Sequence, residues 1–399
     1  MTSPLDGIRV LEVASWIAVP AAGALMADLG ATVIKVESGI GDAWRAASRR
    51  AVSSFPGNPG FQLDNRGKQG IAINLDRADG QAVVRRLVQS VDVFTTNLVP
   101  GRRLRYGLAY EALAATNPRL VYLAFSGYGD DGPDRDRLSF DFTAFWARSG
   151  MLDIMAEPDA PPPMPPGSMG DHATAPLLLA AIMTALFERE RSGLGQQVQT
   201  SLLNSALWAL GSDLQQMLVG GPVPKATPRL QTNPMRNSYR AGDGRWFMLM
   251  APAERDWPRV CAALERPELE HDPRFAAFAD RTRNGPQLIA EMDATFAVRP
   301  RREWGERLDA QGVVWGPVEA LPGVPDDPQV QANGYLTQNT HPAVGAYLTL
   351  NTPMRFSRSE AGPRGPAPEV GQHTEEVLLA AGYTWDDITA LRDSGAIGV

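Results

Sequence analysis

The chain has 399 residues, of which 44% are apolar, so it is long enough for two or three domains with ordinary hydrophobic cores. Its 45 acidic residues outnumber its 38 basic residues and give a formal net charge of -7, which argues against nucleic-acid binding and leaves any polyphosphate to be held by local cations. One cysteine and four scattered histidines exclude an intrachain disulfide and predict no metal site, and no apolar run approaches the roughly 18 residues of a membrane span. The first residues lack the basic segment and apolar core of a signal peptide, so we expect a cytoplasmic protein without membrane association.

The first third of the chain alternates predicted strands with predicted helices. Apolar runs of strand length are separated by segments with helical periodicity. Such alternation predicts a largely parallel sheet that is covered by helices on both faces. The predicted strands are 8–13, 32–37, 70–75, 91–95 and 120–125, and the predicted helices are 20–29, 80–90 and 110–117.

The middle of the chain contains a proline-rich loop, 157–167, in which proline disfavours both helix and strand. An apolar, alanine-rich and leucine-rich run at 173–189 predicts a buried helix. A strand at 197–201 and a helical pattern that ends near residue 219 follow it.

A second domain is predicted at 237–321, after a Gly/Pro-punctuated linker at 221–236. It begins with a hairpin over 238–249 and continues with short helices between 254 and 310. The first domain then spans 1–220, and the segment 322–399 changes to loops and strands before a helical tail at 374–394.

The opening strand–helix–strand unit invites a dinucleotide-binding interpretation, because Glu37 ends the second strand where such folds place a ribose-binding acid. The turn between the first strand and the helix reads ASWIAVP, however, and lacks the glycines that let a backbone approach a pyrophosphate. The sequence therefore argues against NAD(P) and FAD.

Two basic segments are candidates for phosphate binding. Asn65, Arg66 and Lys68 form a short polar segment before a strand, and Arg side chains with Lys suit phosphate oxygens. A second cluster contains Arg102, Arg103 and Arg105. On these residues alone, a solvated loop or helix start is the commoner explanation of both segments.

Asp171 follows Gly170 at the start of the apolar helix, where two interpretations are open. Aspartate is a favoured helix cap, and its charge suits the positive end of a helix. A catalytic aspartate would need a glycine that lets substrate approach and free amides to hold an oxyanion. No G-x-S-x-G, H-E-x-x-H or P-loop motif offers another nucleophile or metal site.

The chain contains eight motifs in this order: PLDGIRVLEV at 4–13, DLGATVIKVES at 28–38 with GDAWR ending at 45, NRGK at 65–68, NLVPG at 97–101, FSGYGDDGP at 125–133, GDHATA at 170–175, DDPQVQANGYL at 326–336, and GQHTEEVL at 371–378. Each motif alone is a weak signal, but eight in order over nearly the whole chain are a strong one. Together they resemble the family III CoA transferases, which include formyl-CoA and carnitine CoA transferases and the α-methylacyl-CoA racemases.

The resemblance implies an α/β fold with a Rossmann-like large domain built from both chain ends, to which 322–399 returns, and a smaller inserted α+β domain. It also implies an obligate homodimer with interlocked subunits, in which dissociation and unfolding are coupled.

The resemblance further implies that Asp171 is the nucleophile. Its carboxylate, expected to be ionised at neutral pH because an unperturbed aspartate has a pKa of about 3.9, would attack an acyl-CoA thioester and form a mixed anhydride and CoA thiolate. A carboxylic acid would then accept the transferred group, without a metal or a permanently bound cofactor. The implied coenzyme A contacts are Asn65, Arg66, Lys68, Asn97, Arg105 and Phe140.

Phe140 stands where the racemases of this family place a proton-transferring histidine, so the sequence favours transfer over racemisation. His172 adjoins Asp171 and is an alternative base. The apolar loop 15–20 suits a larger acyl group than formyl. A 2-methylacyl-CoA racemase, an intramolecular CoA-transferring isomerase and a non-catalytic acyl-CoA-binding protein stay open as alternatives.

Overall fold

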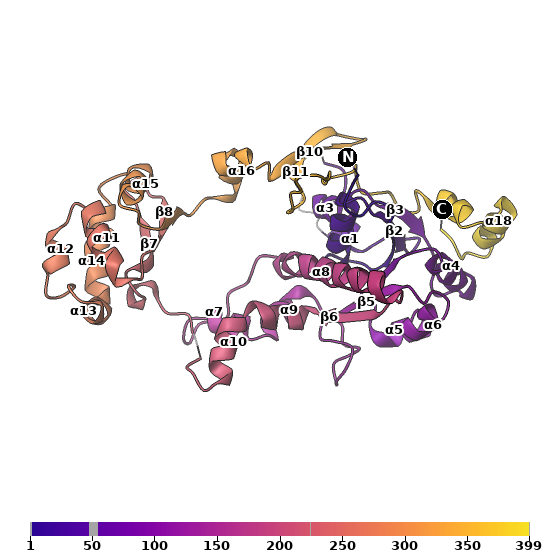
Figure 1. The fold of residues 1–399 in the computed structure, drawn as a ribbon, viewed down its shortest axis with the longest axis horizontal. Helices are drawn as coiled ribbons and strands as arrows, with labels where there is room; N and C mark the ends of the chain where they lie inside the picture. Colours follow the sequence, from indigo (N-terminus) through magenta and orange to yellow (C-terminus); the bar gives the residue numbers. More distant parts are fainter. Residues whose placement is uncertain (1, 48–54, 224, 399) are drawn as a thin grey trace. The chain divides into compact units, whose positions relative to one another are not determined.

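The computed structural model describes residues 2–47, 55–223 and 225–398, and it divides into two compact units (Figure 1). Unit 1 is formed from 1–153, 163–223 and 333–399, so both ends of the chain belong to it. Unit 2 is formed from 154–162 and 224–332. Unit 2 contains the whole of the predicted second domain and adds residues from the predicted linker, the proline-rich loop and the segment after residue 321.

Unit 1 is built on a six-stranded sheet in the order β3-β2-β1-β4-β5-β6, and every neighbouring pair is parallel. The alternation of strands and helices along the chain predicted such a sheet, so the predicted α/β fold with a parallel sheet is confirmed. The strand order reverses between β1 and β4, and open sheets of this kind bind ligands at the carboxyl ends of the strands there. The strands are β1 (Arg9–Val13), β2 (Thr32–Glu37), β3 (Gln69–Ala72), β4 (Val93–Thr96), β5 (Val121–Ser126) and β6 (Gln197–Ser201).

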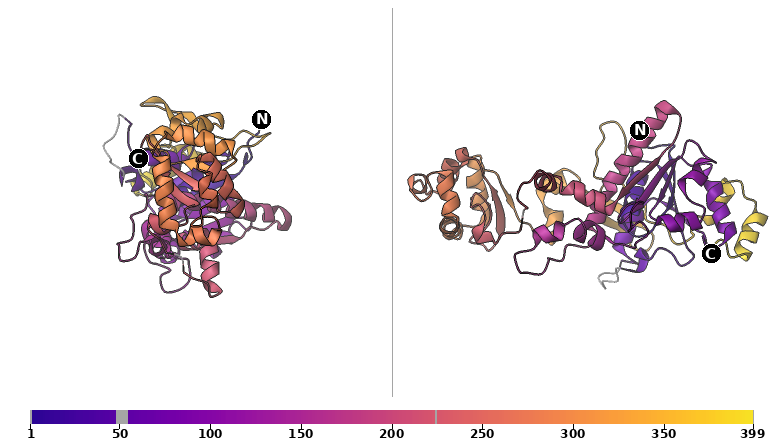
Figure 2. Two further views of the ribbon diagram at one scale, coloured as in Figure 1. Left: turned by 90° about the vertical axis from the view of Figure 1, so that its left-hand side faces the viewer. Right: turned by 90° about the horizontal axis from the view of Figure 1, so that it is seen from below.

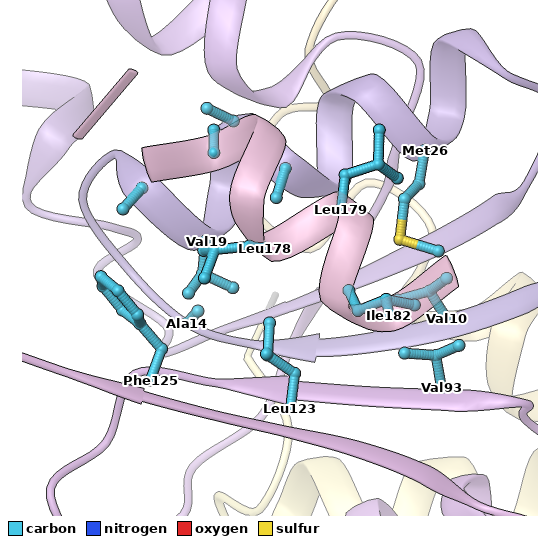
Figure 3. Close-up of a cluster of buried hydrophobic side chains, with 14 of the residues drawn as sticks. Val10, Ala14, Val19, Met26, Val93, Leu123, Phe125, Leu178, Leu179 and Ile182 are labelled. Carbon is cyan, nitrogen blue, oxygen red and sulfur yellow. The ribbon is translucent and has the colours of Figure 1, made fainter. Parts of the chain in front are cut away.

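Apolar side chains are buried on both faces of this sheet, as the near-continuous apolar strands predict. One cluster lies under α1 (Ala18–Asp28) and α8 (Met169–Ser192), and the other lies under α4 (Ala78–Val88) and the C-terminal helices. Figure 3 shows Leu178, Leu179 and Ile182 of α8 packed with Val19 and Met26 of α1. Helix α8 is long and apolar enough to cross a membrane, but these contacts make it a core helix.

The remaining elements of unit 1 are helices and one antiparallel hairpin, which Figure 2 shows from two further sides. The predicted helix that ends near residue 219 is two helices in the structure, since the chain bends at Leu210 before Gly211. These elements are α2 (Trp44–Ala47), α3 (Pro59–Asn65), α5 (Pro100–Arg105), α6 (Tyr110–Ala114), a π-helix (Phe142–Ala147), α9 (Leu202–Ala209), α10 (Gly211–Leu218), β10 (Leu336–His341), β11 (Gly345–Leu350), α17 (Thr374–Ala380) and α18 (Trp385–Asp393). The short helix α7 (Met151–Met155) contains the point in the chain where unit 1 ends and unit 2 begins.

Unit 2 packs helices against one face of a three-stranded antiparallel sheet, in the order β7-β8-β9. Burial alternates along β8, where Phe247 and Leu249 enter the core. The predicted hairpin and the short helices after it are therefore confirmed. The elements are 3-10 helices at Arg229–Gln231, Glu254–Asp256 and Leu321–Asp326, with β7 (Arg236–Arg240), β8 (Trp246–Met250), α11 (Trp257–Ala263), α12 (Glu268–His271), α13 (Phe278–Arg283), α14 (Gly285–Phe296), α15 (Arg301–Ala310), β9 (Trp315–Pro317) and α16 (Pro328–Ala332).

Candidate active site

The loops after β1 and β4 meet where the strand order of the sheet reverses. The side-chain amide of Asn97 donates a hydrogen bond to the Ser15 carbonyl at 2.6 Å, and the Asn97 Oδ1 accepts one from the Ser15 N–H at 3.2 Å. Asn97 therefore fixes the backbone of the first loop, and it lines two adjoining cavities.

The larger cavity has a volume of about 910 Å³ and lies entirely within unit 1. It brings together the loop after β1, the start of α5, the segment before the π-helix and the first turn of α8. Asp171, Asn97 and Phe140, which the sequence singled out, all line it. Its other lining residues include Trp16, Ile17, Trp44, Arg102, Phe125, Arg137, Leu138, Asp141, Phe142 and Ser168.

The smaller cavity, of about 280 Å³, lies at the carboxyl ends of β1, β2, β3 and β4. Acidic and amide side chains line it together with Arg102 and Tyr106. Asn97, Leu98 and Arg102 line both cavities, so a long ligand would reach both through this segment. Further lining residues include Glu37, Ser38, Asp42, Asn74 and Asp76.

Asp171 lies in the first turn of α8, which begins at Met169, four residues before the predicted start. The N-cap position is held by Ser168, and no described residue donates a hydrogen bond to the Asp171 carboxylate. Burial and the neighbouring Asp141 carboxylate raise the pKa of Asp171 to about 7. The expectation of an unperturbed aspartate pKa is therefore corrected, because this environment favours the protonated form of Asp171.

Asp141 is a second buried acid beside Asp171, and the sequence did not mark it as a site residue. Only 3% of its surface is exposed, and its Oδ2 has no hydrogen-bond partner among the described residues. Burial raises the pKa of Asp141, although the backbone amides of Phe142, Gly170 and Ser168 favour its charged form. The buried Asp141 and the partly exposed Asp171 thus raise the proton affinity of the site.

The His172 side chain is bound to Asp64, and His172 is not among the residues that line the larger cavity beside Asp171. Its Nε2 lies 2.8 Å from Oδ1 of the buried Asp64, whose Oδ2 accepts a hydrogen bond from Nε1 of Trp44 at 2.9 Å. The hydrogen bond to Asp64 raises the pKa of His172, which stabilises an imidazolium beside Asp171. The described residues contain no cluster of three or more His, Cys, Asp or Glu that could hold a metal ion.

Gly170 has a packing role that differs from the expected one. A Cβ atom at this position would lie 2.7 Å from the ring of Phe145 in the π-helix. Glycine is therefore required for the close approach of α8 to the π-helix, which carries the Asp141 region to the cavity.

The structure corrects the expected placement of Asn65, Arg66 and Lys68. Arg66 is buried and forms a bidentate ion pair with Asp28, and its third nitrogen donates to the Leu350 carbonyl at 2.6 Å. Lys68 is buried against both carboxylate oxygens of Glu12 at 2.9 Å and donates to Oδ1 of Asn65. Burial and existing pairing leave neither cation free to meet a phosphate.

The second basic cluster divides into different roles. Arg103 is buried in a bidentate pair with Asp130, so it is structural. Arg105 is exposed and forms an ion pair with Asp76, a residue that lines the smaller cavity, at 2.8 Å. Arg102 lines both cavities. The sequence favours a solvated helix start for Arg102, and its position at both cavities becomes visible only from the order of the strands in the sheet.

Trp16 belongs to the apolar loop 15–20, which the sequence associates with a larger acyl group, and it was not singled out as a site residue. Its backbone φ is 68°, in the left-handed region, which costs roughly 1–2 kcal/mol for a residue other than glycine. Its ring packs edge to face against Phe140, with centroids 4.9 Å apart. The identity of an apolar residue does not reveal a strained backbone, so the left-handed conformation of Trp16 could not be predicted from the sequence.

Comparisons with known proteins identify the family of the chain. A family model described as CoA-transferase family III matches residues 5–374. A cinnamoyl-CoA:phenyllactate CoA-transferase of Clostridium sporogenes is 30% identical over 98% of this chain and 96% of its own length. A succinyl-CoA–D-citramalate CoA-transferase of Chloroflexus aurantiacus is 33% identical over 98% of this chain and 97% of its own. The crystal structure of a CAIB/BAIF family protein from Brucella suis superposes with a TM-score of 0.84 and 30% identity, covering 96% of this chain and 100% of that one. The chain therefore belongs to CoA-transferase family III and is an enzyme of that type.

Proposed function

We propose that this enzyme moves coenzyme A between an acyl-CoA and a carboxylic acid through covalent intermediates on Asp171. One observation carries the proposal: the Asp171 carboxylate lines the large cavity, and no described residue donates a hydrogen bond to it. A carboxylate that faces the cavity and is not held by a donor from the protein is open to form a bond to a substrate carbonyl.

In the first step, an Asp171 oxygen forms a bond to the thioester carbonyl carbon, the carbon–sulfur bond breaks, and CoA leaves as the thiolate. The thiolate then attacks the aspartyl carbonyl of the mixed anhydride, which releases the donor acid and leaves an aspartyl-CoA thioester. The acceptor carboxylate repeats these two steps in reverse order and leaves as the new acyl-CoA. Each step exchanges one acyl bond for another, so no redox partner or metal is required.

We place the CoA along the two adjoining cavities. The adenosine phosphates would lie near Arg102 and Arg105, which are the basic side chains at the smaller cavity and its rim. The thiol arm would pass Asn97 and reach Asp171 beside Phe140. Arg66 and Lys68 have no part in this placement, because both are held in buried ion pairs.

The racemase alternative needs a base on each face of the α-carbon. Phe140 supplies none, and His172 is held by Asp64. Asp141 and Asp171 both line the large cavity, so the observation that favours transfer over racemisation is Phe140 itself, which cannot move a proton. A transferase also requires a free acceptor acid, whereas the racemase and the intramolecular isomerase do not.

The proposal is tested by incubating the enzyme with a panel of acyl-CoAs and trapping the product with hydroxylamine or borohydride. We expect peptide mass spectrometry to find the modification at Asp171 alone. An enzyme that exchanges the α-proton of a 2-methylacyl-CoA for deuterium, with no adduct from any donor, would contradict the proposal and favour the racemase.

The rate of the first step should depend on pH. Because the pKa of Asp171 is raised to about 7, the nucleophilic carboxylate form is lost as the pH falls through that value. We expect kcat/KM to rise about tenfold per pH unit below pH ~6.5 and to level off above pH ~7.5. A rate that stays constant from about pH 5 to about pH 8 would show that the ionisation of Asp171 does not limit the reaction.

We further propose that two chains form a homodimer. Unit 1 exposes large apolar side chains on three consecutive helices, and such surfaces are usually covered in an assembly. Sedimentation equilibrium is expected to give the mass of two chains, and a single-chain mass at micromolar concentration would contradict this. The exposed residues are Leu177 and Phe187 on α8, Trp208 on α9, and Met217 and Leu218 on α10.

A further inference from the structure

The loop after β1 holds Trp16 in a conformation that its side chain disfavours. A bulky aromatic residue with a φ of 68° is a true outlier, and such strain persists only where the surroundings fix it. Glycine would adopt this backbone without strain. The shape of the loop therefore does not explain a tryptophan at this position, whereas a role for its ring does.

Buried contacts on both sides hold this backbone. The Trp16 N–H donates to Oδ1 of Asp42 at 3.1 Å, and Asp42 is itself buried and paired with Lys35 at 3.0 Å. The preceding Ser15 is held by both groups of the Asn97 amide. The direction of the Trp16 ring is thus set by a rigid frame, as a binding surface requires.

Three aromatic side chains form a wall of the large cavity. The rings of Trp16 and Phe140 cross at 85° with centroids 4.9 Å apart, and Trp44 lies 6.2 Å from Trp16. Phe140 remains 52% exposed, so much of its ring is open to a ligand. All three side chains line the same cavity as Asp171. An apolar ligand group gains most from covering these rings, because the contact removes apolar surface from water on both sides.

The charges of the cavity agree with an uncharged acyl group. A second carboxylate, as in a dicarboxylic acid, would need its own cation. Among the described residues that line the large cavity, Arg102 and Arg137 are the cations. Arg102 also borders the smaller cavity, and Arg137 lies 3.5 Å from the carboxylate of Asp134. Arg102 is assigned to the CoA phosphates, which leaves Arg137 as the one cation among these lining residues for a second carboxylate, and the comparison with succinyl-CoA tests that contact.

We propose that Trp16 is the specificity-determining residue of this site and that, with Phe140, it selects acyl groups that carry an aromatic ring. This inference rests on the proposed function, since it names the substrate class of the same cavity. Aromatic rings pack favourably edge to face or offset, so a phenyl group would extend the arrangement that Trp16 and Phe140 already form.

The test measures the release of CoA thiol in a single turnover in the presence of hydroxylamine, which requires no acceptor acid, with the enzyme-free reaction of each donor subtracted. The donors are 3-phenylpropanoyl-CoA, acetyl-CoA and succinyl-CoA, and the quantity compared is the second-order rate constant for each. The wild-type enzyme is expected to prefer the phenylpropanoyl donor by roughly tenfold or more over both others. A ratio near one, or a preference for succinyl-CoA, would overturn the inference.

Two variants separate the ring from the loop. Trp16→Gly removes the ring and suits the left-handed backbone, so the preference for the phenylpropanoyl donor over acetyl-CoA should fall by roughly tenfold. Trp16→Phe keeps an aromatic face and should retain most of that preference. A wild-type ratio in Trp16→Gly would contradict the inference even if both variants fold well.

A matched control is Trp385→Ala, which removes an exposed tryptophan of α18 that lines neither cavity and should leave all three rates unchanged. The outcomes also separate this inference from the proposed function. If no donor releases CoA or modifies Asp171, the proposed function fails. If the donors react without preference, only the assignment of the substrate class fails.

Discussion

Replacing Asp171 with asparagine is expected to lower the rate of CoA transfer by at least roughly 1,000-fold, because the loss of a covalent nucleophile closes the reaction path. Asparagine keeps the size of the side chain, so the cavity and the start of α8 should be preserved. The measurement is kcat/KM for acyl transfer to an acceptor acid, together with mass spectrometry for any residual adduct.

The stability of the same variant distinguishes catalysis from helix capping. Because the folded-state pKa of Asp171 is raised from 3.8 to about 7, ionisation of this group destabilises the folded chain as the pH rises through that range. Asp171→Asn removes this cost, so its thermal unfolding midpoint at pH ~8 should equal or exceed that of the wild type. A residue whose main role is to stabilise the helix start would give a lower midpoint instead.

A matched control is Asp213→Asn, since Asp213 also lies in the first turn of a helix, α10, but is exposed and lines neither cavity. Its replacement should leave the transfer rate unchanged and should alter stability by at most about 1 kcal/mol. Full activity in Asp171→Asn would rule out the proposed nucleophile, whatever its stability.

The parallel sheet and the candidate nucleophile could both be predicted from the sequence. Strand-length apolar runs such as that of β5 are buried on both faces, and this pattern is local to each strand. Asp171 was found through a motif, and the structure adds what the motif lacks: an absence of hydrogen-bond donors among the described residues and a neighbouring Asp141. The pKa of Asp171 is raised first by burial and then by Asp141, and the sequence shows neither of these, so it predicts an unperturbed value.

The predicted phosphate contacts of Arg66 and Lys68, in contrast, are wrong, because the sequence does not show which groups these cations meet. A short basic segment looks the same whether it meets a ligand or a buried carboxylate. The partners are Asp28 and Glu12, which are 38 and 56 residues away in the sequence. Glu12 stands in an apolar strand, and only the pairing of β1 with its neighbours reveals which cations it meets.

Glu12 is the centre of a buried charge network below the active-site loop. Lys68 lies 2.9 Å and Lys35 lies 3.4 Å from its Oε1, and all three side chains are fully inaccessible to solvent. Burial alone would lower the pKa of both lysines. The carboxylates of Glu12, Asp42 and Glu37 outweigh burial at Lys35 and raise its pKa, whereas Lys68 has fewer carboxylates near it and its pKa falls to about 8.

This network also orders the active site. Lys35 donates to the Ala14 carbonyl at 2.9 Å and to Oδ2 of Asp42, whose other oxygen accepts the Trp16 N–H. The space beside Glu12 is already filled, because a Cβ atom added to Gly23 of α1 would lie 2.1 Å from Oε2 of Glu12. The buried charges of Glu12, Lys35 and Asp42 at the end of β1 thus also hold the backbone of the loop between β1 and α1 in place.

Glu12→Gln is therefore expected to lower the free energy of unfolding by about 3–5 kcal/mol, because it leaves buried lysine charge without its partner. Chemical unfolding followed by circular dichroism measures the change. The double variant Glu12→Gln with Lys68→Met removes the unpaired charge and should recover much of the loss, since Lys35 keeps Asp42. Glu306→Gln, which breaks an exposed pair with Arg302 on α15, should cost no more than about 1 kcal/mol. If Glu12→Gln were as mild as Glu306→Gln, the buried network would not hold the end of β1, and the fixed position of the Trp16 loop would need another source.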